Sequence, residues 1–273
     1  MQPTAQAEAR FNGIVRLYGA TGAARLRQAH VGVVGIGGVG SWAVEALARS
    51  GVGQITLVDL DDVCISNTNR QLHALTGTFG KPKVEVMAER IRAIHPDCQV
   101  HARQEFFLKS NAEAILATKF DCVFDAIDQL GMKCLLIALC REKNIPLVTT
   151  GGAGGRRDPA AVEVADLALT GGDPLLAQVR KKLRDEFGFP RDKKPFGVEC
   201  VFSREPMIYS QADGSVSCER TTMDLRIDCS TGLGTASFVT GTFGFTAASR
   251  IVQKLVGADG TGNIYNRSNG NAR

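Results

Sequence analysis

A glycine-rich turn near the N-terminus constrains the fold of this chain more than any other feature. The sequence Gly35-Ile36-Gly37-Gly38-Val39-Gly40 follows a short apolar run and precedes a segment with helical periodicity. Glycines allow a sharp turn, which brings backbone N–H groups and the positive end of a helix close to phosphate. A strand, this loop and a helix, in that order, predict the nucleotide-binding unit of a Rossmann-like fold.

Strands and helices alternate regularly through the first 150 residues. Short β-branched runs without polar alternation predict strands that are buried on both faces. The expected strands are 30–35, 54–59, 99–104, 122–126 and 147–150, and the expected helices are 41–50, 82–94, 111–118 and 132–143. This βαβ series predicts an α/β fold with a Rossmann-like, doubly wound, mostly parallel sheet.

The rhythm changes after the five small residues Gly151–Gly155. Strands are expected at 162–169 and 198–203, a charged helix at 174–187 and a last helix at 238–256. We interpret this part as a C-terminal elaboration of the same sheet. The expected organisation is one domain, 1–273, with a nucleotide-binding half at about 25–155, an elaboration at about 156–257 and a disordered tail at 258–273. Residues 1–9 are expected to be loose.

Composition narrows the functional classes. The 32 Lys and Arg residues exceed the 28 Asp and Glu residues by four, a balance that permits an anionic partner without requiring one. None of the eight cysteines forms a CxxC pair, which argues against zinc, and no secretory signal opens the chain. We expect reduced thiols in a cytoplasmic protein. The uncharged stretch 232–249 is expected to be a buried helix of small residues, so membrane association is not expected.

Acidic residues follow two of the predicted strands. Asp59 ends the second strand about twenty residues after the glycine loop, where a carboxylate can accept hydrogen bonds from ribose hydroxyls. The alternative is a glycine-rich packing turn with a helix-capping Asp59, which the register of loop, strand and acid disfavours. Asp125 and Asp128 follow the fourth strand, where an acid could hold Mg²⁺ that bridges phosphate oxygens.

Fixed cations distinguish two nucleotide chemistries. Arg70, in the polar segment 59–71, and Lys83, at the head of the next helix, could neutralise charge that develops on departing pyrophosphate. A dehydrogenase that binds NAD has no need of them. The chain has no GxxxxGK[ST] loop, so phosphoryl transfer by a P-loop is excluded. This pattern favours a site that splits a triphosphate with release of pyrophosphate.

Four motifs make the first 150 residues resemble the superfamily of E1-like adenylating enzymes. They are GxGGxG, DxDxVxxSNxxRQ, the Pro-Lys pair before the second long helix, and the strand end FDAID. The resemblance implies ATP and Mg²⁺ as cofactors and an acyl-adenylate made from a carboxylate. It also implies nucleotide-binding, catalytic and metal roles for particular residues. The implied nucleotide-binding residues are Gly35, Gly37, Gly38, Gly40, Asp59, Asp61, Asn67, Arg70 and Lys83; the implied catalytic residues are Arg70, Lys83 and Asp128, with Asp128 as the metal ligand.

Nearly the whole chain is similar to one branch of that superfamily, the tRNA threonylcarbamoyladenosine dehydratases. The motifs that carry this likeness are RFNGIVRLYG, IGGVGSWAVEALARSGVG, TGGAGGRRDP and CSTGLGTASFVTGTFGF. The resemblance implies adenylation of the threonylcarbamoyl carboxylate on adenosine 37 of ANN-decoding tRNAs, then cyclisation with loss of AMP. Ring closure by a tethered nucleophile benefits from effective molarities of about 10⁵ M or more. A homodimer is also implied.

Two departures set the chain apart from the sulfur-carrier-activating members of the superfamily. Those members usually carry two CxxC pairs that bind structural zinc, and this chain has none, so zinc is not expected. They also carry an N-terminal arginine that reaches the partner subunit's nucleotide. Gly13 stands in that place here. Either Arg16 substitutes for it or the contact between subunits is lost.

Recognition of an anticodon loop calls for a basic rim near the adenylate site. The clusters 180–184 and 191–194, beside Arg156 and Arg157, are candidates for tRNA contact, with a solvated helix face as the alternative. Cys229 is interpreted as a buried residue in preference to a thioester-forming nucleophile, since no His or Lys lies near it in sequence. The histidines, 30, 73, 95 and 101, have no metal-binding spacing and are interpreted as ordinary.

Three other functions remain as alternatives. The first is adenylation of the C-terminal glycine of a ubiquitin-like sulfur carrier. The second is a nucleotide-binding adaptor, whose bound ATP shapes a surface for a cysteine desulfurase or another protein partner. NAD-linked oxidoreduction ranks last, because Arg70 and Lys83 would be superfluous there.

Overall fold

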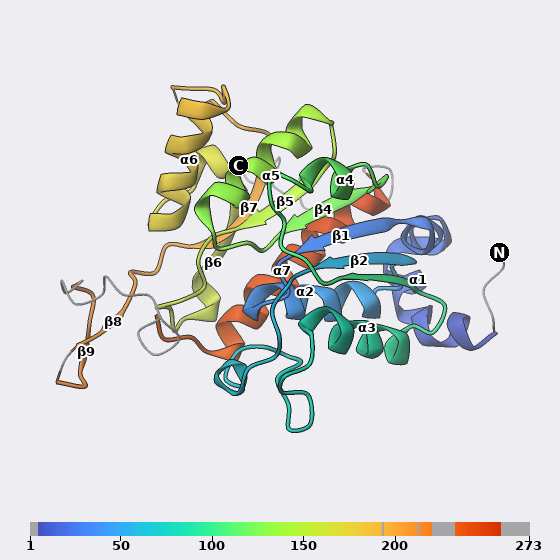
Figure 1. Cartoon of the computed structure of the whole chain (residues 1–273). Helices are drawn as coiled ribbons and strands as arrows, with labels where there is room; N and C mark the ends of the chain where they lie inside the picture. Colours follow the sequence, from blue (N-terminus) through green and yellow to red (C-terminus); the bar gives the residue numbers. More distant parts are fainter. Residues whose placement is uncertain (1–4, 193, 212, 220–232, 258–273) are drawn as a thin grey trace, which may run out of the picture.

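A seven-stranded sheet forms the centre of the molecule in the computed structural model (Figure 1). The structure describes residues 5–192, 194–211, 213–219 and 233–257, with side chains from residue 9. The strand order is β3-β2-β1-β4-β5-β7-β6. The strands are β1 (His30–Val34), β2 (Gln54–Val58), β3 (Gln99–Arg103), β4 (Cys122–Asp125), β5 (Leu147–Thr150), β6 (Val162–Asp166) and β7 (Glu199–Ser203).

All neighbouring strands are parallel except β6, which pairs antiparallel with β7 at one edge. The predicted doubly wound, mostly parallel sheet is therefore confirmed. The chain runs outward from β1 to β3 on one side. On the other side it runs from β4 through β5 to the edge strand β6 and returns to β7, which lies between β5 and β6. The strand order thus reverses between β1 and β4, and in such sheets the carboxyl edge at this point is where ligands bind.

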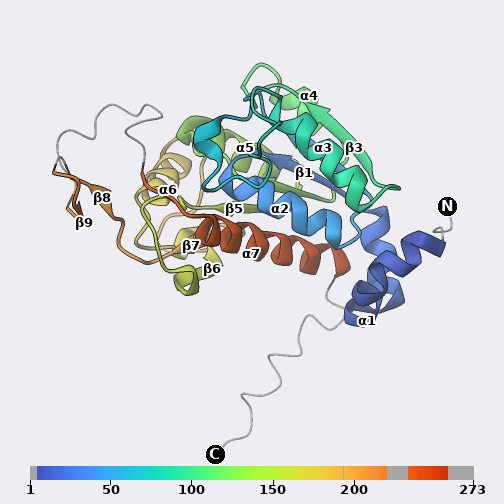
Figure 2. The same ribbon diagram turned by 90° about the horizontal axis from the view of Figure 1, so that it is seen from below.

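Helices cover both faces of the sheet (Figure 2). One face carries α1 (Ala5–Gln28), α2 (Gly38–Arg49), α3 (Lys83–Ile94) and α7 (Ser237–Val256), and the other carries α4 (Ala112–Leu116), α5 (Leu130–Glu142) and α6 (Pro174–Glu186). A small hairpin, β8 (Tyr209–Ser210) and β9 (Val216–Ser217), projects from the body. No helix of the described chain has the length and hydropathy needed to span a membrane.

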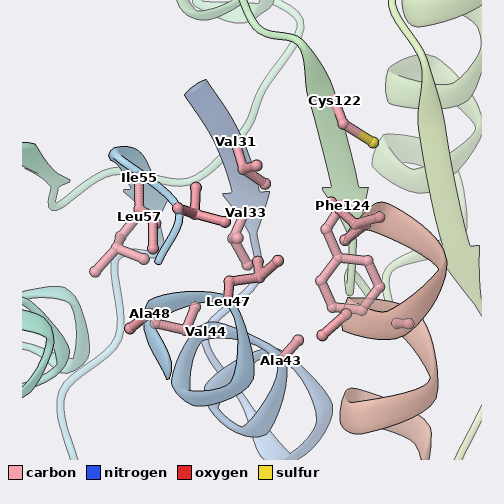
Figure 3. Close-up of a cluster of buried hydrophobic side chains, with 14 of the residues drawn as sticks. Val31, Val33, Ala43, Val44, Leu47, Ala48, Ile55, Leu57, Cys122 and Phe124 are labelled. Atoms are coloured by element: carbon pink, nitrogen blue, oxygen red, sulfur yellow. The ribbon is translucent and has the colours of Figure 1, made fainter. Parts of the chain in front are cut away.

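Alternate residues of the central strands pack against opposite helical layers. Val31 and Val33 of β1 face α2, where they contact the cluster that contains Val44 and Leu47 (Figure 3). Val34 belongs to the cluster on the other face. All five side chains are nearly or completely buried. Burial of each such side chain contributes roughly 1.5–3 kcal/mol, which explains why the strands are apolar throughout.

Two expectations about the elements were wrong. Residues 5–9 are not loose, because α1 begins at Ala5 and continues to Gln28, with a kink at Gly19. The strand expected at 162–169 ends at Asp166, whose carboxylate accepts a hydrogen bond from the backbone N–H of Ala168 (2.8 Å). This capping bond starts a short 3₁₀ turn and stops the strand.

Candidate nucleotide site

The first glycine-rich loop connects β1 to α2 at the carboxyl edge of the sheet. Gly35 has φ +93°, and a side chain there would bring its Cβ within 2.7 Å of the Ala126 carbonyl oxygen. A Cβ on Gly40 would lie 1.9 Å from the Gly35 carbonyl oxygen. These two glycines are therefore required by the turn itself and by its contact with the loop after β4. Their contact with nucleotide remains a prediction.

The N-terminus of α2 lies open beside this loop. Gly37 is the N-cap residue, and no side chain of the described residues caps the helix. The nearest atom to a Cβ on Gly37 would be Nε2 of Gln71, at 4.0 Å. A Cβ on Gly38 would meet Thr240 of α7 at 3.2 Å, so this glycine lies against the closing helix. The first amides of α2 and its positive dipole end are free to receive an anion.

Asp59 lies at the end of β2, directly beside the loop. Its Oδ2 accepts a hydrogen bond from the backbone N–H of Ile36 (2.6 Å), and its Oδ1 accepts one from Asp61 (2.9 Å). Burial raises the pKa of the Asp59 carboxyl, although Lys83 and the two backbone bonds oppose this rise. These two bonds hold the carboxylate beside the glycine loop, and its contact with ribose stays a prediction.

Lys83 and Asp61 form an ion pair where α3 begins. Lys83 Nζ lies 2.8 Å from Asp61 Oδ2, and the two side chains are 7% and 54% exposed. The backbone N–H of Lys83 also donates to the Asp61 carbonyl (3.0 Å). Asp61 was predicted as a nucleotide-binding residue, and the structure places it as the counter-ion of the predicted phosphate-binding lysine.

Arg70 is a cation without a carboxylate partner among the described residues. Its Nη1 donates to the Ser66 carbonyl (2.8 Å) and to Asn69 Oδ1 (3.0 Å). The Arg70 carbonyl in turn accepts bonds from Trp42 (3.0 Å) and Thr240 (3.1 Å). These bonds fix the backbone of Arg70 against α2 and α7 and leave charge on its guanidinium for an anionic ligand.

Asn67 is buried, and its side chain supports the same turn. Its Oδ1 accepts a hydrogen bond from the Cys64 N–H (3.0 Å), which closes the 3₁₀ turn η1 (Ile65–Asn67). Asn69 donates to the Thr235 carbonyl (2.9 Å) and so ties this turn to the chain before α7. The polar segment predicted to bind phosphate is thus a fixed turn beside α2.

Two residues in this region were not singled out as functional from the sequence. Gln71 is 7% exposed, and its Oε1 is buried without a hydrogen-bond partner among the described residues. His73 is 1% exposed, and neither of its ring nitrogens has a partner in the described chain. Burial, with a smaller contribution from Lys83, lowers the pKa of His73 to about 4. Gln71 is the last residue of the motif DxDxVxxSNxxRQ, but no sequence pattern shows that its Oε1 or the His73 ring has no partner, because burial follows from packing.

The two acids after β4 have different roles. Asp125 is completely buried, lies 2.9 Å from Lys133 Nζ and accepts a 2.6 Å hydrogen bond from Thr149. The hypothesis that Asp125 holds Mg²⁺ is therefore wrong. Asp128 is exposed, and no hydrogen bond from the described residues engages its carboxylate. It lies two residues beyond Ala126, which contacts the glycine loop. No group of three acidic, His or Cys side chains in the described chain forms a metal cluster.

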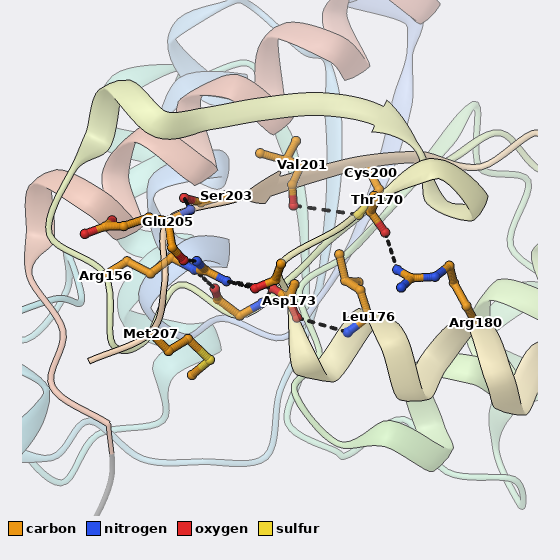
Figure 4. Close-up of polar contacts among 12 residues, drawn as sticks. Arg156, Thr170, Asp173, Leu176, Arg180, Cys200, Val201, Ser203, Glu205 and Met207 are labelled. Atoms are coloured by element: carbon orange, nitrogen blue, oxygen red, sulfur yellow. Dashed lines mark hydrogen bonds and ion pairs between the residues drawn. The ribbon is translucent and has the colours of Figure 1, made fainter. Parts of the chain in front are cut away.

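The second glycine-rich segment, Gly151–Gly155, follows β5 and is braced by buried charges (Figure 4). Arg156 is 2% exposed and pairs with Asp173, so its predicted place on a tRNA-binding rim is wrong. Arg180 donates to Thr170 (2.5 Å) and is also directed inward. The physical reason is that the buried guanidinium of Arg156 pairs with Asp173, the residue that caps α6, and that the half-buried guanidinium of Arg180 is held by Thr170 just before that helix.

The rest of the predicted basic rim is largely neutralised. Lys181 pairs with Asp185 (2.8 Å), and Lys182 pairs with Glu186 (2.6 Å), each one helical turn away. Arg191 also pairs with Asp185 (3.2 Å). This arrangement is the solvated helix face that stood as the alternative. Arg157 and Lys194 are exposed.

Five of the cysteines are buried thiols. Burial raises the pKa of Cys98, Cys122 and Cys140 to about 12 and that of Cys134 to about 11, and it also raises the pKa of Cys200. Thiols with such pKa values are not nucleophiles at neutral pH. Cys64 and Cys218 are exposed. The interpretation of Cys229 concerns a residue outside the described part of the chain.

Comparisons with known proteins identify the family and the fold of the chain. The ThiF family model matches residues 11–271. The tRNA threonylcarbamoyladenosine dehydratase of Escherichia coli (strain K12) is 50% identical over 90% of this chain and 93% of its own length. The solved structure of the E. coli enzyme TcdA in complex with ATP superimposes with a TM-score of 0.83 at 45% identity, covering 93% of this chain and 97% of that one.

The likeness to sulfur-carrier enzymes is shorter. The E. coli sulfur carrier protein ThiS adenylyltransferase is 34% identical over 49% of this chain and 53% of its own length. The likeness to the dehydratase therefore extends over parts of the chain that this match leaves out.

Proposed function

The chain belongs to the ThiF family, and from this premise we propose that it is an ATP-dependent tRNA threonylcarbamoyladenosine dehydratase. It adenylates the carboxylate of N6-threonylcarbamoyladenosine at position 37 of tRNA, releases pyrophosphate, and closes the modification to its cyclic form with loss of AMP. The observation that carries this proposal is the extent of the likeness, which covers nine-tenths of both chains. The chain acts as a single domain in which the nucleotide-binding half and the elaboration share one sheet.

The proposed nucleotide-binding roles follow from the hydrogen-bonding groups and charges that other described residues do not already engage. The open N-terminus of α2 receives phosphate, and Asp59 accepts hydrogen bonds from the ribose. Arg70 supplies a charge that no described carboxylate neutralises, so it stabilises the departing pyrophosphate. Lys83 contributes to the same site, and the approach of a polyphosphate competes with Asp61 for its ammonium group.

Asp128 is the residue that would hold Mg²⁺. Its carboxylate is exposed at the carboxyl edge of the sheet and is not committed within the described chain, which fits a single protein ligand that leaves the other coordination positions to phosphate and water. The ion would neutralise phosphate charge when bound.

Ring closure needs no enzyme-bound covalent intermediate in this scheme. The mixed anhydride with AMP and the nucleophile that attacks it belong to the same tRNA side chain, so the enzyme has to hold one conformation and exclude water. The high pKa values of the buried thiols are consistent with a reaction that uses no cysteine among them.

The decisive experiment is mass spectrometry of nucleosides from tRNA that has been incubated with the protein and ATP. Threonylcarbamoyladenosine should lose one water molecule, with one AMP formed per nucleoside converted. Matched tRNA that lacks the modification should give neither product. Formation of AMP and pyrophosphate with a ubiquitin-like sulfur carrier, and none with modified tRNA, would instead establish the sulfur-carrier alternative. Nucleotide binding without either reaction would indicate an adaptor.

We also propose that the protein works as a homodimer in the cytoplasm, where its tRNA substrate resides. A cysteine desulfurase is the protein partner to test first. Size-exclusion chromatography with light scattering measures the oligomeric state, and a pull-down with the purified desulfurase measures the second association. A monomer, or the absence of binding, would refute the respective proposal.

A further inference from the structure

A buried ion pair lies behind the second glycine-rich loop, apart from the nucleotide-binding residues. The side chains of Arg156 and Asp173 are 0% and 1% exposed, and Nη2 of the arginine lies 3.4 Å from Oδ2 of the aspartate. Neither group reaches solvent, so neither touches a substrate directly. A buried pair of this kind contributes little net stability, although removal of one partner is strongly destabilising. Its significance lies in the backbone that it holds.

The pair engages both polar groups of Gly152. The Gly152 N–H donates to Asp173 Oδ2 (2.9 Å), and Arg156 Nε donates to the Gly152 carbonyl (3.1 Å). A further nitrogen of the guanidinium donates to the carbonyl of Glu205, just after β7. Glycine has the largest choice of backbone conformations, so these bonds determine the course of the loop.

The same loop anchors two segments that are far apart in sequence. The Gly155 N–H donates to the Gly234 carbonyl (2.7 Å), and the Ile208 N–H donates to the Gly155 carbonyl (2.8 Å). A Cβ on Gly154 would lie 2.9 Å from Cβ of Leu233, so the chain before α7 packs directly on this loop. Displacement of the loop would therefore move the base of the β8–β9 hairpin and the approach to α7 together.

Along the strand order, the loop Gly151–Gly155 and Asp59, the proposed ribose-binding residue, lie on opposite sides of β1. In the strand order, β2 and Asp59 lie on one side of β1, whereas β4 and β5 lie on the other. The end of β4 is joined to β5 by the hydrogen bond from Thr149 to Asp125 (2.6 Å). With the nucleotide over β1 and β2, the carboxylate to be activated has to approach from the β4–β5 side of the crevice.

We propose that Arg156 and Asp173 are positioning residues for the tRNA substrate. They hold the loop Gly151–Gly155, and the two segments anchored on it, in the arrangement that receives the modified nucleotide, without contact to ATP. This inference rests on the proposed function. It requires that loss of the pair weakens the productive binding of tRNA and leaves the affinity for ATP unchanged.

The test compares two variants that retain different parts of the pair. Arg156→Lys keeps the charge but loses the fork of donors that reaches Gly152, Glu205 and Asp173 together. The double variant Arg156→Met with Asp173→Leu removes both charges, so that neither is left buried without its partner. Asp173 also accepts a hydrogen bond from the N–H of Leu176 at the start of α6, so the Tm of this variant is measured first. For each, KM and kcat with modified tRNA are measured at saturating ATP, and the Kd for ATP is measured by calorimetry.

We expect KM for tRNA to rise about tenfold or more in both variants, because small displacements of a substrate-positioning segment have effects of this size. The Kd for ATP should stay within about twofold. Arg90→Met is the matched control: Arg90 lies 2.6 Å from the nearly buried Glu45, and this pair joins α2 to α3 away from the loop. It should lower the Tm without a change in KM for tRNA.

Two results would overturn the positioning role. One is an unchanged KM for tRNA in the double variant at a temperature where it is fully folded. The other is a Kd for ATP that rises as much as KM. Failure of the wild-type protein to convert modified tRNA would refute the proposed function itself and is distinguishable from both results.

Discussion

The two glycine-rich loops lie at the same edge of the sheet and differ in what their polar groups do. In the first, after β1, the start of α2 carries no side-chain cap, and Arg70 beside it has no carboxylate partner in the described chain. In the second, after β5, a buried arginine and aspartate engage both polar groups of Gly152. One loop is open to an anion, and the other is closed by the protein's own charges.

This difference teaches that glycine content marks a close backbone approach and does not by itself mark a ligand site. The loops differ in whether the arginine beside each one has a carboxylate partner in the described chain. No carboxylate of the described chain pairs with Arg70, whereas the charge of Arg156 is compensated by Asp173 within the core. Arg156 directly follows the second glycine-rich sequence, whereas Arg70 comes from the separate polar segment 59–71, so packing and not sequence position decides which charge is compensated.

The largest expected effect compares one glycine from each loop. Gly40→Ala would place a Cβ 1.9 Å from the Gly35 carbonyl oxygen, and Gly152→Ala would place one 3.9 Å from Asp173 Oδ2. Backbone has to move in the first case, so we expect a loss of unfolding free energy of about 3 kcal/mol or more; the second should lose less than about 1 kcal/mol. Urea unfolding measures both. Equal losses of unfolding free energy in the two variants would show that the two loops tolerate an added side chain equally.

Acid should weaken the region around the first loop through His73. Its pKa is lowered from 6.5 to about 4 by burial, so the unfolded chain binds the proton more readily. The contribution of neutral, buried His73 to the free energy of unfolding is therefore fully present above pH 6.5. It falls by roughly 3 kcal/mol as the pH drops from 6.5 toward 4. His73→Leu should reduce this acid-dependent loss, measured as Tm against pH. An identical pH profile in the variant would contradict the assignment.

Arg70→Met should lower the rate of adenylation about a hundredfold while the Tm changes little. The reason is that Arg70 has no carboxylate partner among the described residues. We therefore expect its charge to stabilise the departing pyrophosphate and to contribute little to the free energy of unfolding. Pyrophosphate exchange into ATP, with modified tRNA present, measures the effect. Exchange at the wild-type rate would show that adenylation does not depend on the charge of Arg70.

The smallest expected effect concerns the N-terminus of α2. Gly37→Ala meets no atom closer than Gln71 Nε2 at 4.0 Å, so the fold should accept it. The added methyl group would nevertheless lie where phosphate approaches α2, and we expect ATP affinity to fall about tenfold. Calorimetry gives the affinity, and the Tm serves as the control. A variant that binds ATP normally would show that the nucleotide does not approach α2 from this side.

Much of the sheet was predictable because buried parallel strands leave a direct trace in sequence. Short β-branched runs separated by helical periods predicted the strands of the nucleotide-binding half, and the elaboration was expected on the same sheet that β6 and β7 join. Helix α1 was missed, since its composition has only a weak apolar period and includes Gly13 and Gly19. Its place is determined by packing against α7, which local sequence does not encode.

The sequence by itself determined the βαβ order, the glycine loop after β1 and the register of Asp59 with that loop, because these depend on residue type and short-range spacing. Only the tertiary structure decided which charges are compensated: Asp61 pairs with Lys83, Asp125 with Lys133 and Arg156 with Asp173, while Arg70 and Asp128 have no charged partner among the described residues. Charge pairing depends on distances of a few ångströms between segments that are remote along the chain, and the energy of a charge depends on its burial.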